Sequence, residues 1–490
     1  MSEYWKDHAQ KASIQTMMLD SNAEELSKDE VPEIMSYLPD VANKRMVELG
    51  AGIGRFTNVL AQKAEHVVAV DFMEEFIEKN KKLNNHMRNI DFKCQDVTKM
   101  ELPDASVDIV FSNWLFMYLE DDEVQLVYNK MLRWLKEGGH VFIRESCNRQ
   151  SGNKPRQNNP TNYREDIKYD AMFSAANIPY DETHNYGFDL VFSTAVVTYI
   201  KHKNNKDQRV WLLQKVKRDK AENHGFKTFQ EFLDSQQYSK NSILRYEKVF
   251  GRTFVSTGGL STTKDFVKLL DLKPGQRVLD VGGGIGGSAF YMVQNYGVKV
   301  VSIDLSSNMT SIGYERAEEL GIPPDHVVFE IADATKRDYP DNSFDAIYSR
   351  DAILHIKEKL ELFQRFYKWL KPGGKILISD YCCKEGDHSE EFKAYVKQRG
   401  YNLLNPSQYG KVLEKAGLVN VKAEDKTVLF GEILRSELER TLSIKDEFIE
   451  EFGEKNYNDI VEGWTDKVKR VGKGDGDQRW GLFYAEKPRH

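Results

Sequence analysis

The stretch MVELGAGIGRF (residues 46–56) and its counterpart RVLDVGGGIGGS (277–288) each join a short apolar run to a glycine-rich turn. Glycine permits a positive φ and lets the backbone approach a ligand closely. A helix that follows such a turn offers unpaired amide groups at its N-terminus. Both stretches therefore predict a strand, a ligand-binding turn and a helix, which together begin a doubly wound α/β sheet.

Four further segments of the first half recur in the same order in the second half. HVVAVD (66–71) matches KVVSID (299–304), FKCQDV (92–97) matches FEIADA (329–334), PDASVDIVFSNWLFMYL (103–119) matches PDNSFDAIYSRDAILHI (340–356), and WLKEGGHVFIRES (134–146) matches WLKPGGKILISDY (369–381). The separation stays at about 235 residues, so a whole domain is duplicated rather than a short solenoid unit.

The strands of each half are expected to be buried on both faces. VDIVFS (107–112) and FDAIYS (344–349) are apolar at several consecutive positions, and amphipathic stretches alternate with such runs. We expect two tandem Rossmann-like domains, each a mostly parallel seven-stranded sheet flanked by helices. Residues 188–216 predict a terminal hairpin around the polar turn NNKD, and 430–472 predict a charged helical insertion, a candidate lid.

Acidic residues accompany both glycine turns. Glu48 and Asp280 precede a G-x-G-x-G run, whereas the dinucleotide fingerprint G-x-G-x-x-G serves a pyrophosphate, so a cofactor without phosphate is favoured over NAD. Such an acid suits the cationic amino-acid end of S-adenosyl-L-methionine. Asp71 and Asp304 end the second strands, where a carboxylate accepts hydrogen bonds from both ribose hydroxyls.

A third acid follows the third strand of each half, where it is suited to the adenine amino group, and further polar residues lie at the same sheet edge. We therefore expect two class I methyltransferase domains, 1–220 with the start of a linker and 221–490. The predicted cofactor-binding residues are Glu48, Gly50, Gly52, Arg55, Asp71, Asp96, Val97 and Asn113 in the first and Asp280, Gly282, Asp304, Asp333, Ala334 and Arg350 in the second.

Composition excludes several classes of protein. With 69 basic and 76 acidic residues the formal charge is −7, and no long single-sign block suggests a nucleic-acid surface. No apolar run reaches the roughly 20 residues of a membrane helix, and no secretory signal pattern begins the chain. The four cysteines lack C-x-x-C spacing. We expect a cytosolic monomer without a metal, without membrane insertion and without a nucleic-acid partner.

Several motifs resemble those of phosphoethanolamine N-methyltransferases, and the chain length resembles the plant-type tandem enzymes in particular. The motifs are VELGAGIGRFT (47–57), FSNWLFMYL (111–119), QQY (236–238), STGGL (256–260), YSRDAILH (348–355), ISDYC (378–382), YVKQRGY (395–401) and DQRWG (477–481). The resemblance implies methylation of phosphoethanolamine through its N-methyl and N,N-dimethyl forms to phosphocholine, for phosphatidylcholine synthesis. S-adenosyl-L-methionine would be the donor, and S-adenosyl-L-homocysteine the product.

The resemblance also implies roles for residues of the second half. His355 would act as the base and Tyr238 as its latch, while Asp351 would orient water or the amine. A primary amine has a reference pKa of roughly 10.4, so a base is useful at neutral pH. The substrate would be bound by Gln237, Tyr246, Tyr381, Tyr395, Arg399, Tyr401 and Lys467, and the cofactor also by Val255 and Ser256.

The first half departs from this pattern because Tyr118 stands at the position of His355 and Trp114 at that of Asp351. By resemblance it performs the first methylation, with its phosphate held by Ser146, Ser151, Gly152, Arg156 and Tyr163. Two alternatives stay open: another small-molecule methyltransferase, such as a sterol or quinone enzyme with an apolar pocket, and a first domain that only binds cofactor.

Overall fold

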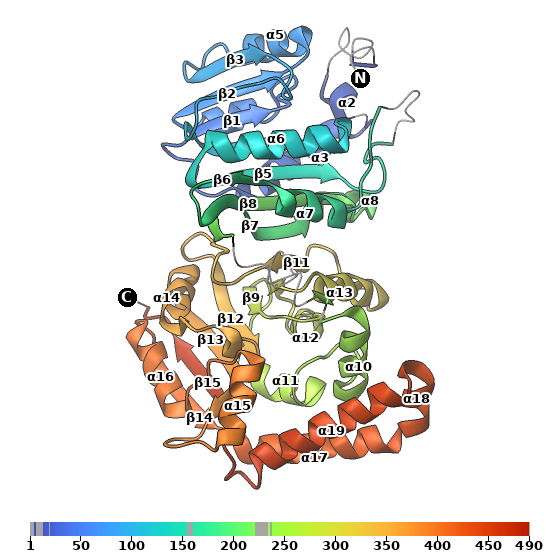
Figure 1. The fold of residues 1–490 in the computed structure, drawn as a ribbon, viewed down its shortest axis with the longest axis vertical. Coiled ribbons are helices and arrows are strands. Elements are labelled where there is room, and N and C mark those ends of the chain that lie inside the picture. The colour runs from blue at the N-terminus through green and yellow to red at the C-terminus, as the bar shows by residue number, and fades with distance from the viewer. Residues whose placement is uncertain are drawn as a thin grey trace. The chain divides into compact units, whose positions relative to one another are not determined.

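A computed structural model describes residues 4–5, 13–18, 20–153, 160–220, 234–235 and 238–489. The chain forms two compact units, 1–229 and 230–490 (Figure 1). The sequence predicts a polar linker over residues 215–237, but β8 (Gln208–Asp219) continues to Asp219 because it pairs with β7 (His184–Ala195) along its length.

The first unit has the strand order β3-β2-β1-β4-β5-β8-β7, with the short β6 beside β7. The pairs from β3 to β5 are parallel, and β8 is antiparallel to both its neighbours. The remaining strands are β1 (Arg45–Leu49), β2 (His66–Asp71), β3 (Ile90–Cys94), β4 (Val107–Asn113), β5 (Leu135–Ser146) and β6 (Asn177–Pro179). The helices are α2 (Ile14–Met18), α3 (Ala23–Tyr37), α4 (Thr57–Ala61), α5 (Glu74–Leu83), η1 (Phe116–Tyr118), α6 (Asp121–Trp134), α7 (Asp166–Ala175) and α8 (Val197–Lys203).

The predicted terminal hairpin of the first unit is only partly correct. Its two strands are antiparallel neighbours, but residues 197–203 form helix α8 instead of extending the first strand. The carboxylate of Glu33 on α3 accepts from the amides of Val197 (2.6 Å) and Thr198 (2.9 Å) and so caps this helix. A cap supplied from a residue so distant in the chain cannot be recognised from local sequence.

The second unit repeats the same order, β11-β10-β9-β12-β13-β15-β14. Its strands are β9 (Arg277–Val281), β10 (Lys299–Asp304), β11 (Val327–Ala332), β12 (Phe344–Arg350), β13 (Leu370–Cys383), β14 (Val419–Asp425) and β15 (Gln478–Glu486). Its helices are α10 (Lys240–Phe250), α11 (Gly259–Val267), η3 (Lys268–Leu270), α12 (Gly287–Tyr296), α13 (Ser307–Glu319), η4 (Ile353–His355), α14 (Lys359–Trp369), α15 (Glu390–Arg399), α16 (Pro406–Lys415), α17 (Thr427–Ser443), α18 (Lys445–Phe452) and α19 (Glu454–Val471). The expected tandem of mostly parallel seven-stranded sheets is confirmed.

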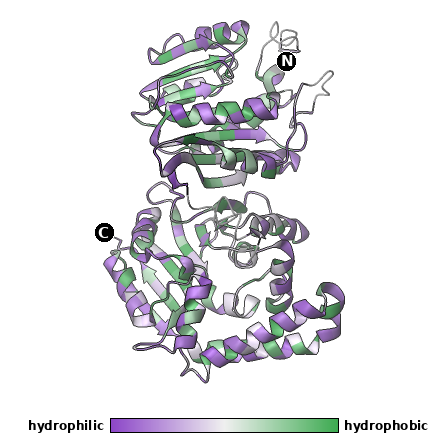
Figure 2. Cartoon of the chain, viewed as in Figure 1, coloured by the Kyte–Doolittle hydropathy of each residue, from purple (hydrophilic) through white to green (hydrophobic). Residues whose placement is uncertain are grey.

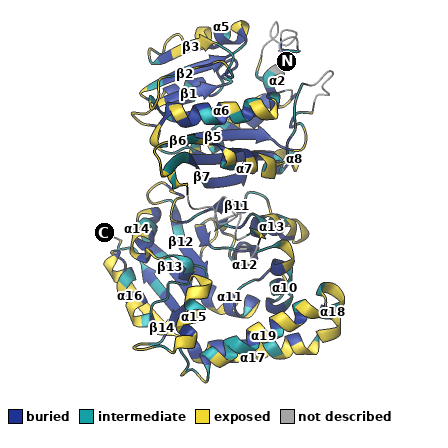
Figure 3. Ribbon diagram, in the orientation of Figure 1, coloured by how far each residue is buried: buried dark blue, intermediate teal, exposed yellow. Residues whose placement is uncertain are grey.

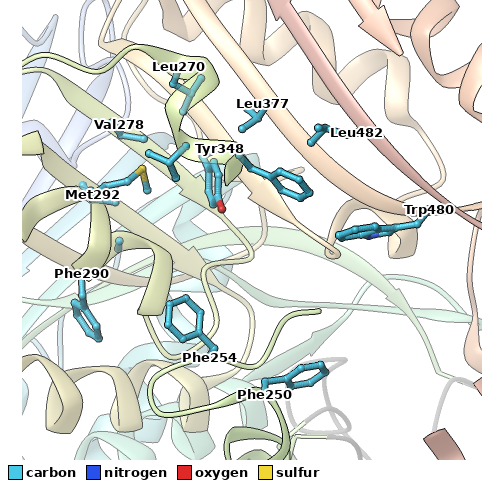
Figure 4. Close-up of a cluster of buried hydrophobic side chains, with 14 of the residues drawn as sticks. Phe250, Phe254, Leu270, Val278, Phe290, Met292, Tyr348, Leu377, Trp480 and Leu482 are labelled. Atoms are coloured by element: carbon cyan, nitrogen blue, oxygen red, sulfur yellow. The ribbon is translucent and has the colours of Figure 1, made fainter. Parts of the chain in front are cut away.

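Most strands are apolar and buried, whereas β3 and β14 are largely exposed, and the helices turn their polar faces to solvent (Figures 2 and 3). Figure 4 shows ten labelled side chains from the core of the second unit. The same core includes Phe430 of α17 and Trp464 of α19, and the ring of Phe430 stacks on Trp480 with centroids 5.3 Å apart. The helical insertion is therefore anchored at its base by buried aromatic rings. No helix in the described part of the chain is long and apolar enough to cross a membrane.

Candidate functional site

A cavity of about 450 Å³ lies at the carboxyl ends of β1, β2 and β4 in the first unit. Its volume is within the usual range of small-molecule sites. All eight residues that the sequence predicts for cofactor binding in this half line it: Glu48, Gly50, Gly52, Arg55, Asp71, Asp96, Val97 and Asn113. Trp5 and Met17 of the N-terminal segment line it as well, and the sequence analysis did not identify them.

The acids that end the second strands hold the glycine turns in both units. Asp71 accepts from the amides of Gly52 and Met73, each at 2.9 Å, and Asp304 accepts from Gly284 (3.0 Å) and Ser306 (2.9 Å). Burial raises the pKa of both carboxyls to about 6, against the lowering effect of these amide bonds. Each acid thus has its carboxylate fixed beside the glycine backbone.

The acids that precede the glycine turns differ in their partners. Glu48 accepts from the hydroxyl of Thr57, and burial raises its pKa to about 8. Burial and the nearby Asp304 raise the pKa of Asp280 to about 7, and its Oδ2 is buried without a hydrogen-bond partner in the part of the chain that the structure describes. Such an oxygen is suited to a cationic group that is not part of the protein.

The third acids adopt the same local turn in both units. Asp96 accepts from the amide (2.9 Å) and the hydroxyl (2.7 Å) of Thr98, and Asp333 accepts from the corresponding groups of Thr335 at 2.9 and 2.6 Å. The neighbouring Val97 and Ala334 are buried. One carboxylate oxygen of each acid therefore orients its own loop.

The segments that precede the first strands cover the middle glycines. Gly52 and Gly284 have φ values of 54° and 56°, and a Cβ atom would lie 2.8 Å from Met17 Cε on the first and 2.7 Å from Val255 Cγ2 on the second. The predicted contact Val255 thus lies against the glycine turn, next to the half-buried Ser256. Gly282 is equally restricted, because its Cβ would lie 2.2 Å from Ala352 Cβ.

The predicted arginines are bonded mainly to protein. Arg55 donates to Glu30 on α3. Burial alone would raise the pKa of the Glu30 carboxyl, but the charges of Arg55 and Arg144 together hold it below its ordinary value. Arg350 donates to the carbonyl of Thr257 (2.7 Å) and to four hydroxyls, of which those of Thr262 and Ser379 lie nearest, at 2.9 and 2.7 Å. These side chains tie the leading segments to the strand edge.

His355 lies in η4, and its ring meets the edge of Tyr401 with centroids 5.2 Å apart. Burial, followed by the charges of Arg399 and Lys359, lowers its pKa to about 4. The imidazole is therefore neutral at pH 7, with a free nitrogen lone pair, and its lowered pKa makes it a weaker proton acceptor than an exposed histidine. Burial and then Asp304 raise the pKa of Tyr238, while Arg399 lowers it, so Arg399 is an electrostatic neighbour of both expected dyad residues.

Asp351 has a positive φ of 51° and three hydrogen-bond donors around its carboxylate. Oδ1 accepts from Trp480 Nε1 at 2.8 Å and from the hydroxyl of Ser379 at 3.1 Å, and Oδ2 accepts from the amide of Thr257 at 3.4 Å. Trp480 lies on the last strand, 129 residues away in the chain. The carboxylate is thus held in one orientation.

The described residues expected to bind phosphate form one chain of contacts. Lys467 Nζ donates to the Tyr381 hydroxyl at 2.7 Å, and the Tyr401 ring lies 6.4 Å from Tyr381 and 5.8 Å from Tyr395. The Arg399 guanidinium lies 6.0 Å from the Tyr395 ring. The sequence analysis missed Arg470, whose guanidinium lies 3.8 Å from that same ring.

Tyr246 joins this group through Trp464, the aromatic residue one helical turn before Lys467, with centroids 6.1 Å apart. Burial lowers the pKa of Lys467. A phosphate dianion placed among these donors would favour the charged ammonium. The arrangement is thus polar and aromatic rather than the apolar pocket that a sterol or quinone needs.

The residues expected to bind substrate in the first unit are less closely grouped. Ser151 lines the cavity, whereas the Ser146 hydroxyl donates to the Arg149 carbonyl (2.7 Å) and accepts from Gln208 Nε2 (2.6 Å). The carbonyl of Gly152 accepts from Gln150, and Tyr163 is half-buried. Arg156 and Gln237 lie outside the described residues. No three His, Cys, Asp or Glu residues of the described chain are grouped so as to hold a metal ion.

Two models of a methyltransferase domain match the chain, one over residues 47–143 and the other over 261–423. Each unit is therefore a methyltransferase domain, as the sequence predicts.

Relatives match almost the whole length. The chain is 50% identical to phosphoethanolamine N-methyltransferase 3 of Arabidopsis thaliana, over 99% of this chain and 97% of that enzyme, and 51% identical to phosphoethanolamine N-methyltransferase of Triticum aestivum, over 99% and 94%. Among solved structures it resembles phosphoethanolamine N-methyltransferase 2 of Haemonchus contortus in complex with phosphomonomethylethanolamine and S-adenosylhomocysteine. The TM-score is 0.74 at 27% identity, over 94% of this chain and 99% of that one.

Proposed function

The chain belongs to the phosphoethanolamine N-methyltransferase family, and we propose that it converts phosphoethanolamine to phosphocholine through the N-methyl and N,N-dimethyl intermediates. The observation that best supports this proposal is a group of donor side chains beside His355, namely Lys467, Tyr381, Tyr395, Arg399 and Tyr401. This group offers donors for a phosphomonoester next to a base for an amine, the two functional groups of the substrate.

The cofactor sites of both units fit S-adenosylmethionine. When bound, this cofactor supplies an electrophilic methyl group. Asp280 Oδ2 and Glu48 would hold its cationic amino group, since both acids are buried at the end of the first strand of their unit. Asp71 and Asp304 would accept from the ribose hydroxyls with the lone pairs that the backbone amides leave free.

In the second unit, the residues position the amine and take its proton. At pH 7, releasing the lone pair of a group with a pKa of roughly 10.4 costs on the order of 4 to 5 kcal/mol. His355 is neutral at that pH and so can accept the proton, while the Asp351 carboxylate would hold the remaining N–H groups. Lys467 and Arg399 would fix the phosphate and thereby align the nitrogen.

The first unit would perform the first methylation and the second unit the later two. This division is supported by the complete set of cofactor acids in both units and by the different residues at their strand edges, with Trp114 and Tyr118 in place of Asp351 and His355. We also infer that the protein is cytosolic, because its four cysteines are free, which suits a reducing compartment. We further infer that it is a monomer. Light scattering coupled to size exclusion would test the monomer.

The test of this proposal is the product profile of the full chain with His355→Ala. We expect phosphoethanolamine to be converted to the N-methyl compound, which then accumulates, while S-adenosylhomocysteine affinity stays unchanged. Phosphocholine formation at a near-normal rate would contradict the role of His355 as base. Absence of any turnover would contradict the activity of the first unit.

A second variant tests the phosphate contact. Lys467→Met should raise the KM for N-methylated acceptors about 10- to 100-fold, because it removes a charge-assisted hydrogen bond. Lys469→Met, on the exposed side of the same helix, is the matched control and should leave KM unchanged. An unaltered KM for Lys467→Met would show that the phosphate binds elsewhere.

A further inference from the structure

Trp114 and Asp351 occupy the same unusual backbone position, directly after the fourth strand of their units. Their φ values are 57° and 51°, in the left-handed region that residues other than glycine seldom adopt. The amide of Trp114 donates to the carbonyl of Arg144, and that of Asp351 to the carbonyl of Ser379, both at 2.8 Å. The backbone therefore fixes each side chain at the equivalent position of its own sheet, at the carboxyl end of the fourth strand.

Each of the two side chains makes a hydrogen bond to the strand that comes last in the sequence of its unit, but with donor and acceptor exchanged. Trp114 Nε1 donates to Gln208 Oε1 at 3.0 Å, whereas Asp351 Oδ1 accepts from Trp480 Nε1 at 2.8 Å. Gln208 and Trp480 hold equivalent positions, because each pairs with the last residue of a matched segment, Ser146 in β5 or Tyr381 in β13.

The exchange gives the two corners different chemistry. In the first unit the indole of Trp114 lines the cavity, and the Arg144 guanidinium lies 3.6 Å from its ring centroid. A ring bonded at its nitrogen and covered by a cation has little freedom to move aside. In the second unit a short carboxylate takes this position, and the indole belongs to the last strand instead.

We propose that this reciprocal exchange determines which amine each unit methylates. Trp114, held by Gln208, restricts the first unit to the unsubstituted amine, because its ring occupies the space that an N-methyl group needs. Asp351, held by Trp480, leaves that space free and offers a carboxylate to the remaining N–H of a methylated ammonium. The inference rests on the proposed function of both units.

The experiment uses the full chain with His355→Ala, so that turnover reports the first unit. Trp114→Asp with Gln208→Trp recreates the arrangement of the second unit. We expect the ratio of kcat/KM for N-methylphosphoethanolamine to that for phosphoethanolamine to rise at least about tenfold, since a single methyl group changes selectivity by about 10- to 200-fold in a shaped pocket. An unchanged ratio in a variant that binds S-adenosylhomocysteine normally would overturn the inference.

Trp114→Phe covers the case in which the double variant does not fold. It keeps an aromatic ring but shortens it and removes the bond to Gln208, and should raise the same ratio at least about threefold. An unchanged ratio here also counts against the inference. Gln214→Leu, on the same strand but bonded to the Gly138 carbonyl, is the control and should leave the ratio unaltered.

The parent His355→Ala chain distinguishes a failure of the proposed function from a failure of the inference. If it does not methylate phosphoethanolamine, the proposed function of the first unit fails and the inference fails with it. If it does methylate phosphoethanolamine but the substitutions at Trp114 and Gln208 leave the ratio unchanged, only the inference fails.

Discussion

Both units use a buried arginine to tie the segment before the first strand to the sheet edge, but the arginine comes from different strands. In the first unit Arg144 lies two residues before the end of the fifth strand, and its Nη2 lies 2.7 Å from Glu30 Oε1. In the second unit Arg350 ends the fourth strand and donates to Thr262 Oγ1 at 2.9 Å. The cross-strand neighbours are Asn113 and Ser379, so the same pair of positions carries the cation in either order.

The exchange also changes the partners of the cation. Glu30 is fully buried between Arg144 and Arg55, whereas Arg350 bonds to neutral oxygen atoms of threonine and serine. A duplicated fold therefore preserves a physical requirement, a cation that reaches the leading segment, more strictly than it preserves the residue that supplies it. The indole exchange between Trp114 and Trp480 follows the same rule.

The largest effect is expected from Arg144→Ala. It leaves Glu30 buried with Arg55 as its remaining cation, and loss of one partner of a buried ion pair typically costs about 3–5 kcal/mol. The free energy of unfolding of the first unit, measured with urea in the full chain, tests this. Arg149→Ala, which removes an exposed partner of Asp207, is the control and should cost less than about 1 kcal/mol. Equal losses from the two variants would contradict the interpretation.

A smaller effect is expected at the second glycine of the turn in the second unit. A Cβ on Gly283 would lie 2.0 Å from the Ser302 hydroxyl, so Gly283→Ala should cost about 1–3 kcal/mol. The first unit has Ala51 and Ala69 at these two positions. Adding Ser302→Ala should therefore restore stability to within about 1 kcal/mol. A double variant no more stable than Gly283→Ala would show that the overlap is not the cause.

The smallest effect concerns the pH dependence of cofactor affinity. A cationic ligand favours the ionised carboxylate, so affinity should fall as the pH drops below the pKa of the free acid, by up to about tenfold per pH unit for one proton. The decline should begin near pH 8 for the first site, through Glu48, and near pH 7 for the second, through Asp280.

Calorimetric titration with S-adenosylhomocysteine between pH 6 and 9 separates the two sites when Glu48→Gln and Asp280→Asn are compared. Each substitution should abolish the pH dependence of its own site and leave that of the other. Identical profiles for the two variants would mean that these acids do not face the amino group.

Much of the cofactor site was predictable because its signals are local. A glycine turn after an apolar run, and an acid at the end of the next strand, follow from backbone geometry within a few residues. In the first unit Gly50, Gly52 and Asp71, which were predicted in this way, line one cavity. The repeat strengthened the prediction, since the same pattern occurs twice in the same order. The residues expected to bind substrate could be predicted only from the resemblance to a known family, because a single tyrosine, lysine or arginine is usually an ordinary surface or core residue.

The sequence by itself therefore determined the tandem α/β fold and placed the acids expected to bind cofactor at the ends of their strands. Only the tertiary structure decided which side chains complete each site: Glu30 beside Arg55, Met17 over Gly52, and Gln208 or Trp480 opposite the fourth strand. The physical reason is distance along the chain. A hydrogen bond between residues 94 or 129 positions apart leaves no local pattern, and it exists only because strand pairing brings the two positions together.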